Sequence, residues 1–142
     1  MMYKAETKII INADIDLIWD YLTKPELVKK YFFNTNMVTT WKVGDEIFFR
    51  GEWEGVKYED KGHVLEFNPP YSLAFDYWSS LSGTEDVPNK YQVIREELKE
   101  VAGGVEISIT QSNVETQEKA DHSVANWNMV YSSLKKMLEE GQ

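Results

Sequence analysis

Two helices are predicted near the ends of this chain, whereas almost all of the remaining sequence alternates in the manner of β-strands. Residues 14–22 give a short amphipathic helix and residues 119–140 a long one. Apolar residues of the long helix recur at alternating steps of four and three, and so share one face: Ala120, Val124, Trp127, Tyr131, Leu134 and Leu138. A single helix cannot bury such a face alone. It needs a sheet to lie on, and a gap between a curved sheet and a long helix can bind a ligand.

The rest of the sequence supplies the candidate strands of an antiparallel sheet. They cover residues 3–11, 37–41, 46–53, 56–67, 71–78, 90–101 and 105–112. Most of them alternate apolar and polar side chains, as half-buried strands do. A second short helix is expected near Pro25, because Thr23 and Glu26 have the spacing of a capping box. Asp14 and Thr116 are candidate caps of the other two helices. The prediction is an α+β fold, built as one domain over residues 1–142.

Charge and composition exclude several classes of partner. The chain carries 24 acidic and 15 basic residues, a formal charge of -9, which is unsuited to nucleic acid or to an anionic membrane surface. It has no cysteine, hence no disulfide framework and no thiolate chemistry. Residues 1–8 lack a hydrophobic signal core, and no apolar run approaches membrane-spanning length. We expect a cytoplasmic protein that is a monomer or weak dimer.

Catalytic and metal motifs are absent from the sequence. His63 and His122 are the two histidines, and neither lies in a metal-binding frame, so no metal site is predicted. No nucleophile elbow and no glycine-rich phosphate loop occurs, and no cofactor is expected. Carboxylates are plentiful, and a pair acting as acid and base stays open. Arg95 and Glu97 share one face of their strand and Glu96 lies on the other, so whichever face is inward carries a charge that needs a partner or a polar ligand.

The order of elements resembles the helix-grip fold of START and Bet v 1 proteins, and in detail the AHSA1-like branch, named after the activator of Hsp90 ATPase, of the SRPBCC superfamily. The strongest match is IDLIWDYLTKPE at residues 15–26. The remaining matches extend over nearly the whole chain in the right order: Val43-Gly44 before Ile47, Gly62-x-Val64 before Pro69-Pro70, Leu73-x-Phe75-x-Tyr77, and Trp127 with Leu134. The chain departs from the family pattern at Tyr31-Phe32, Gly104-Val105 and Asn126-Trp127.

This resemblance implies binding more than turnover, because the family carries no invariant catalytic machinery. The leading hypothesis is therefore a protein that holds an apolar or amphipathic small molecule between the long helix and the sheet. Its expected lining is aromatic, with aliphatic residues beneath: Trp53, Phe75, Tyr77, Trp127, Tyr131, Ile47, Phe49, Ile107 and Ile109. Each of these side chains would serve equally as ordinary core. Two alternatives stay open: a chaperone cofactor or interaction module that binds an Hsp90-type partner, and an enzyme that uses a cavity carboxylate on a small lipid-like substrate.

Overall fold

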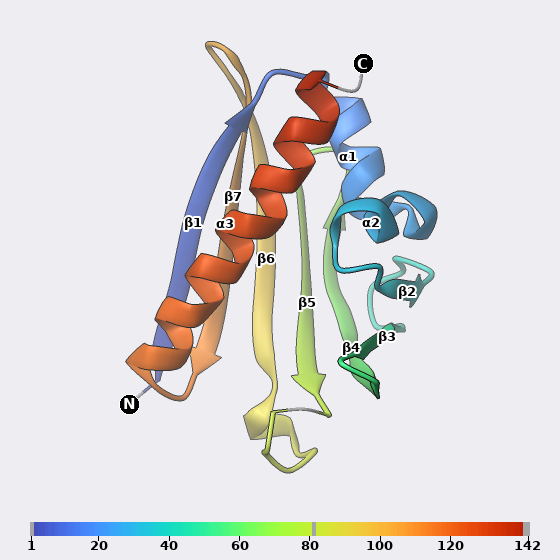
Figure 1. Cartoon of the computed structure of the whole chain (residues 1–142), viewed down its shortest axis with the longest axis vertical. Coiled ribbons are helices and arrows are strands. Elements are labelled where there is room, and N and C mark those ends of the chain that lie inside the picture. Colours follow the sequence, from blue (N-terminus) through green and yellow to red (C-terminus); the bar gives the residue numbers. More distant parts are fainter. Residues whose placement is uncertain (1, 81, 141–142) are drawn as a thin grey trace.

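Seven strands form one antiparallel sheet that curves around a long C-terminal helix (Figure 1). The computed structural model describes residues 2–80 and 82–140, apart from the side chain of Trp53. The elements, in chain order, are β1 (Tyr3–Ile11), α1 (Ile15–Thr23), α2 (Pro25–Tyr31), β2 (Asn36–Thr39), β3 (Glu46–Trp53), β4 (Val56–Asn68), β5 (Ser72–Ser79), the 3-10 helix η1 (Pro88–Lys90), β6 (Gln92–Val101), β7 (Gly104–Val114) and α3 (Gln117–Glu140). The predicted α+β helix-grip fold is confirmed.

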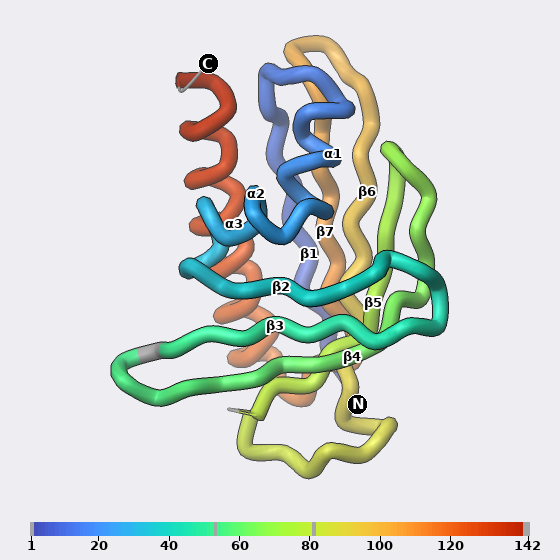
Figure 2. The backbone as a smooth tube through the Cα atoms, turned by 90° about the vertical axis from the view of Figure 1, so that its right-hand side faces the viewer, coloured from blue at the N-terminus to red at the C-terminus, as the bar shows by residue number. Residues whose placement is uncertain are grey.

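The strand order is β1-β7-β6-β5-β4-β3-β2, so β1 and β2 are the two edges. β1 pairs with β7, with Ile9 opposite Ile107. The short helices α1 and α2 then carry the chain from one edge of the sheet to the other (Figure 1). The β3–β4 hairpin extends past the lower part of α3 (Figure 2). The long helix therefore lies over the sheet, and α2 and the β3–β4 hairpin lie close to it.

Helix ends largely follow the predicted caps. Asp14 caps α1, because its Oδ2 accepts a hydrogen bond of 3.1 Å from the backbone N–H of Asp16. The Thr116 hydroxyl accepts one of 3.1 Å from the N–H of Lys119 at the start of α3. Thr23 was expected to cap α2, and this is wrong. Its hydroxyl donates instead to the carbonyl of Trp19 at 2.8 Å, inside α1, and the cap position of α2 passes to Lys24.

The apolar face of α3 is buried as predicted, with one exchange. Ala120, Trp127, Val130, Tyr131, Leu134 and Leu138 are its buried residues. Val130 was not in the predicted set. Val124, which was, is half-buried and packs against a small separate cluster with Ala5 and Val114. The first turns of α3 thus contact the β1–β7 edge, and its middle and last turns contact the main core.

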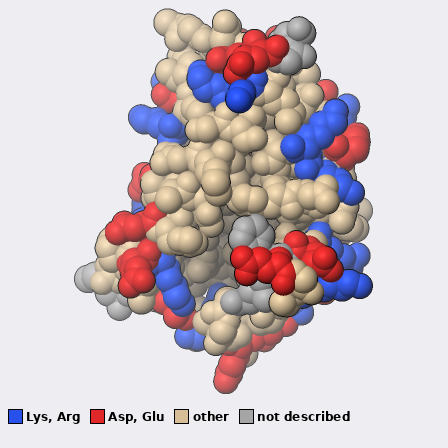
Figure 3. All heavy atoms as spheres, in the orientation of Figure 1, with Lys and Arg blue, Asp and Glu red and all other residues tan. Residues whose placement is uncertain are grey.

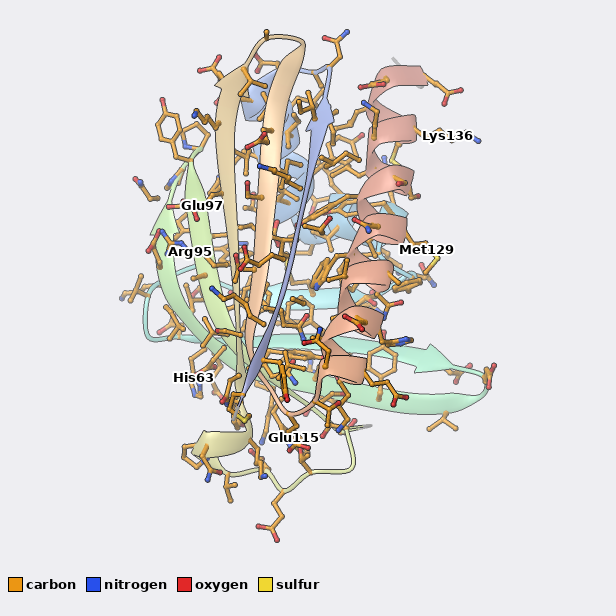
Figure 4. The ribbon with its side chains drawn as sticks, turned by 90° about the vertical axis from the view of Figure 1, so that its left-hand side faces the viewer. His63, Arg95, Glu97, Glu115, Met129 and Lys136 are labelled. Atoms are coloured by element: carbon orange, nitrogen blue, oxygen red, sulfur yellow. The ribbon has the colours of Figure 1, made fainter. Side chains whose placement is uncertain are left out.

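The structure shows which charged side chains of β6 face inward, a point that the sequence left open. Ile94, Glu96 and Leu98 are buried on the inward face, and Glu96 is only 8% exposed. Arg95 and Glu97 lie on the opposite face, away from α3 (Figure 4). There the guanidinium of Arg95 pairs with Glu66 at 2.6 Å and with Glu97 at 3.3 Å. The inward charge of this strand is therefore a carboxyl group.

Candidate functional site

A cavity of about 930 Å³ lies between α3 and the sheet. Its wall draws residues from α2, α3 and strands β2 to β7. Exposed residues such as Phe33 and Met129 belong to the lining, so the cavity opens to solvent, and Figure 3 shows a hollow in this face with uncharged side chains above it. The volume is in the upper part of the range found for small-molecule sites.

The structure brings together five of the nine side chains that sequence reasoning proposed as lining. They are Phe49, Phe75, Tyr77, Trp127 and Tyr131. Ile47, Ile107 and Ile109 are at most 1% exposed and lie in the core beneath, outside the cavity wall. The side chain of Trp53 lies outside the described residues. Aromatic rings therefore dominate the predicted part of the wall, while the three isoleucines pack the sheet behind it.

Several aromatic lining residues were not predicted from the sequence, because they come from the end of α2 and from connecting segments. Tyr31, Phe32, Phe33 and Trp41 all line the cavity. The ring of Phe32 meets that of Trp127 edge-on, with centroids 5.5 Å apart, in the geometry that aromatic pairs favour. Three consecutive aromatic residues at a helix end were the available signal, but their direction depends on how the chain leaves α2.

Trp127 is fixed by a polar chain that crosses from the helix to the sheet. Its indole N–H donates to Oε1 of Gln111 on β7 at 2.8 Å, a buried hydrogen bond. The amide of Gln111 donates in turn to Oε1 of Gln92 on β6. Since Trp127 is only 9% exposed and its ring lies 5.8 Å from that of Tyr131, one side chain both lines the cavity and anchors α3.

Glu96 places a buried carboxyl in the cavity wall. Burial disfavours its charged form and raises the pKa of Glu96 from 4.5 to about 7, while an interaction with the Tyr131 hydroxyl acts in the opposite direction. Among the described residues, neither Oε2 of Glu96 nor the Tyr131 hydroxyl has a hydrogen-bond partner. Unpaired buried polar atoms are costly, so this pair is a specific feature of the wall.

Two phenols face this carboxyl. Burial, and then the charge of Glu96, raises the pKa of both Tyr31 and Tyr131 well above the ordinary value. Both hydroxyls therefore keep their protons at physiological pH. The Tyr31 hydroxyl donates to the carbonyl of Tyr21 at 2.8 Å, which ties α2 to α1. The titratable side chains that interact with Glu96 are therefore uncharged.

A second carboxyl, Asp60 on β4, lies elsewhere in the cavity wall. Burial raises the pKa of Asp60, and hydrogen bonds with the Ser79 and Tyr77 side chains and with the backbone of Ser80 oppose the rise. Its Oδ1 has no hydrogen-bond partner in the described part of the chain. Leu73, which pairs with Glu96, and Ser79, which pairs with Asp60, are six steps apart along β5, about 20 Å of strand. The two carboxyls therefore act as separate groups.

The charged residues at the cavity mouth largely neutralise one another. Glu115 accepts from Lys90 at 3.3 Å and from Lys119 at 3.4 Å. Hydrogen bonds from Lys90 and then Lys119 lower the pKa of Glu115. Glu115 lies at the end of the molecule shown lowest in Figure 4. The lysine charges near the opening are thus engaged with this carboxylate.

Within residues 2–80 and 82–140, no group of three or more His, Asp or Glu side chains is placed to hold a metal ion. The same residues contain no helix with the length and apolar character needed to cross a bilayer.

A match between the sequence and a protein-family model identifies the family. A model of activator of Hsp90 ATPase homolog 1-like proteins matches residues 12–139. The chain belongs to this family. The predicted AHSA1-like membership, within the START/Bet v 1 superfamily, is therefore confirmed.

Solved structures agree with this assignment. ChR145 from Cytophaga hutchinsonii is 42% identical, with a TM-score of 0.85 over 98% of this chain and 95% of that one. A protein described as the Aha1 dimer from Colwellia psychrerythraea is 21% identical, with a TM-score of 0.75 over 99% and 98% of the two chains. DynU16, from the dynemicin biosynthetic locus, is 16% identical, with a TM-score of 0.81 over 98% of this chain and 48% of that one. The last two show the shared fold alone. A comparison with curated proteins finds no significant match.

Proposed function

We propose that this member of the AHSA1-like family binds an apolar or amphipathic small molecule in the cavity between α3 and the sheet. The observation that carries the proposal is the cavity of about 930 Å³, whose wall includes eleven aromatic residues among the described part of the chain. Aromatic and aliphatic walls with a few placed polar groups are typical of small-molecule sites.

The expected driving force is burial of apolar ligand surface. Transfer of about 300 Å² of such surface from water contributes roughly 7 kcal/mol, from which the costs of association are subtracted. The wall keeps its shape because its rings are held by the core: Phe49 and Phe75 are at most 9% exposed, and their centroids lie 5.3 Å apart. A preformed wall loses little side-chain freedom when the ligand enters.

A fluorescence titration tests this proposal. N-phenyl-1-naphthylamine is a neutral apolar fluorophore whose emission rises in an apolar site, and wild-type protein should enhance it with saturable, one-site behaviour. Ser123 lies on α3 in the cavity wall, so Ser123→Phe should fill part of the space and weaken binding by at least about tenfold. Ser132→Phe adds the same ring at an exposed position of the same helix, outside the lining, and should bind as wild type does. Equal binding by wild type and both variants would refute the cavity as the site.

An enzymatic role is the second candidate, and one observation favours it. Glu96 lines the cavity with a pKa of about 7, a value suited to accepting and donating protons near neutral pH. In such an enzyme Glu96 would act as acid or base on a small lipid-like substrate. Turnover of a candidate substrate should then fall at least about 100-fold in Glu96→Gln, while Glu97→Gln, on the outer face, stays active. Retained turnover in Glu96→Gln would exclude this role.

A chaperone-cofactor role is supported by family membership and by the acidic charge of -9. Pull-down with Hsp90 at low and moderate salt tests it, because electrostatic attraction is strongest at low ionic strength. No binding at low salt would remove this role.

A further inference from the structure

The interior of the cavity has an uncompensated acidic character. Glu96 is 8% exposed and lines the cavity, and the influences on its pKa are burial and the Tyr131 hydroxyl, with no basic side chain among them. Asp60 likewise is influenced by hydroxyl and backbone groups alone. Buried carboxyls are normally paired with a cation or a full set of hydrogen bonds. Here Oε2 of Glu96 has no hydrogen-bond partner among the described residues, and neither has Oδ1 of the half-buried Asp60, whose carboxyl is held by hydroxyl and backbone groups.

The basic side chains of the lining cannot supply the missing charge. Lys90 and Lys119 pair with Glu115 at the mouth. His122 is exposed in the first turns of α3. The titratable groups that face Glu96 are Tyr31 from α2 and Tyr131 from α3, and both stay protonated and neutral at physiological pH. Gln111, on the neighbouring strand β7, is uncharged and engaged with Trp127.

The aromatic part of the wall suits a cation as well. Tyr31, Phe32, Trp127 and Tyr131 line the cavity together with Glu96. Phe32, Trp127 and Tyr131 form a continuous run of ring contacts, with centroids 5.5 and 5.8 Å apart. The faces of such rings attract organic cations, and the attraction grows when the cation is removed from water. A carboxyl beside an aromatic wall is a combination that favours an ammonium group over a neutral or anionic one.

We propose that the cavity selects an amphipathic amine, whose protonated ammonium group pairs with the Glu96 carboxylate while its apolar part lies against the aromatic wall. This inference rests on the proposed small-molecule function and adds the chemical class of the ligand.

Proton release distinguishes this ligand class from any other. Glu96 has a pKa of about 7 in the empty protein, so at pH 6 most molecules carry a proton on this carboxyl. A bound ammonium ion stabilises the ionised form of Glu96. Binding should therefore release close to one proton per protein molecule at pH 6, and only a small fraction of a proton at pH 8. A neutral ligand of the same shape should release none at either pH.

Decylamine and decanol provide matched probes, because both carry the same chain and the amine stays protonated over this pH range. Displacement of N-phenyl-1-naphthylamine at pH 8 should show decylamine binding about 10- to 100-fold more tightly than decanol. Glu96→Gln keeps the shape of the side chain and should remove this preference. Glu97→Gln lies next to it on the outer face and should retain it (Figure 4). Calorimetry in two buffers of different ionisation enthalpy then counts the protons released by wild-type protein, a measurement that needs no variant to fold.

The outcomes separate the two proposals. Preference for decylamine with proton release supports the ammonium site. Equal affinities for decanol and decylamine, or tight amine binding without proton release at pH 6, would overturn the ammonium site and leave the small-molecule function standing. Failure of both probes and of the fluorophore to bind would overturn both.

Discussion

Trp127→Ala should be one of the more destabilising single substitutions on α3. The indole is 9% exposed, and tryptophan buries on the order of 150–250 Å² in protein cores. At about 25 cal/mol per Å², loss of this contact removes up to roughly 4–6 kcal/mol, an upper limit because the unfolded chain already covers part of that surface. Measured losses for buried Trp→Ala changes are about 3–5 kcal/mol. The void here joins a cavity that water can enter, so we expect about 3 kcal/mol.

Trp127→Phe separates packing from hydrogen bonding. Phenylalanine retains much of the contact with Phe32 and Tyr131 but cannot donate to Gln111, so the cost should be about 1–2 kcal/mol. Met129→Ala, at a position 54% exposed on the same helix, serves as the matched control and should change stability by no more than about 0.5 kcal/mol. Urea melts followed by circular dichroism give the free energies of unfolding. A loss below about 1 kcal/mol for Trp127→Ala would refute the view that this residue anchors α3 to the sheet.

Three further predictions concern stability. Folding raises the pKa of Glu96 from 4.5 to about 7, so the folded state favours the protonated carboxyl. This contribution to stability is full below pH 4.5 and is lost as the pH rises through about 7. Relative to wild type, Glu96→Gln should therefore gain about 3 kcal/mol between pH 4.5 and pH 8 in urea melts, and an equal difference at both pH values would contradict this. Gly62→Ala would place its Cβ 1.7 Å from the backbone oxygen of Asp76, so we expect a loss of at least about 2 kcal/mol, and an unchanged melting temperature would show that β4 and β5 can separate freely. Asp14→Ala removes the cap of α1 and should cost about 1 kcal/mol, whereas Asp14→Asn should stay close to wild type in the same melts.

Much of the fold could be predicted because its periodicities are strong. β1 and β3 lie where alternation placed them, and α3 begins two residues before its predicted start. Alternation in β6 could not tell the inward face, because both faces carry charges. Only packing against α3 shows that Glu96, not Arg95, is buried.

The candidate site was harder to predict, since part of its wall comes from segments without periodicity. The backbone φ angle is 51° at Phe33 and 59° at Trp41. Few bulky residues adopt a positive φ, so these conformations could not be predicted from the sequence. The orientation of the Trp41 side chain is fixed by its indole N–H, which donates a hydrogen bond of 2.7 Å to the carbonyl of Thr23. Such contacts join residues 18 positions apart and depend on the path between α1 and β3.

Binding of a small molecule between α3 and the sheet can be followed directly by a heteronuclear NMR titration of the tryptophan indole N–H signals. Trp127 and Trp41 line the cavity, whereas Trp19 is 6% exposed in the core outside it. Titration with decylamine, and separately with decanol, should shift the indole signals of Trp127 and Trp41 in a saturable manner and leave that of Trp19 in place. Stationary signals for Trp127 and Trp41 with both compounds, or shifts confined to Trp19, would show that neither compound binds between α3 and the sheet.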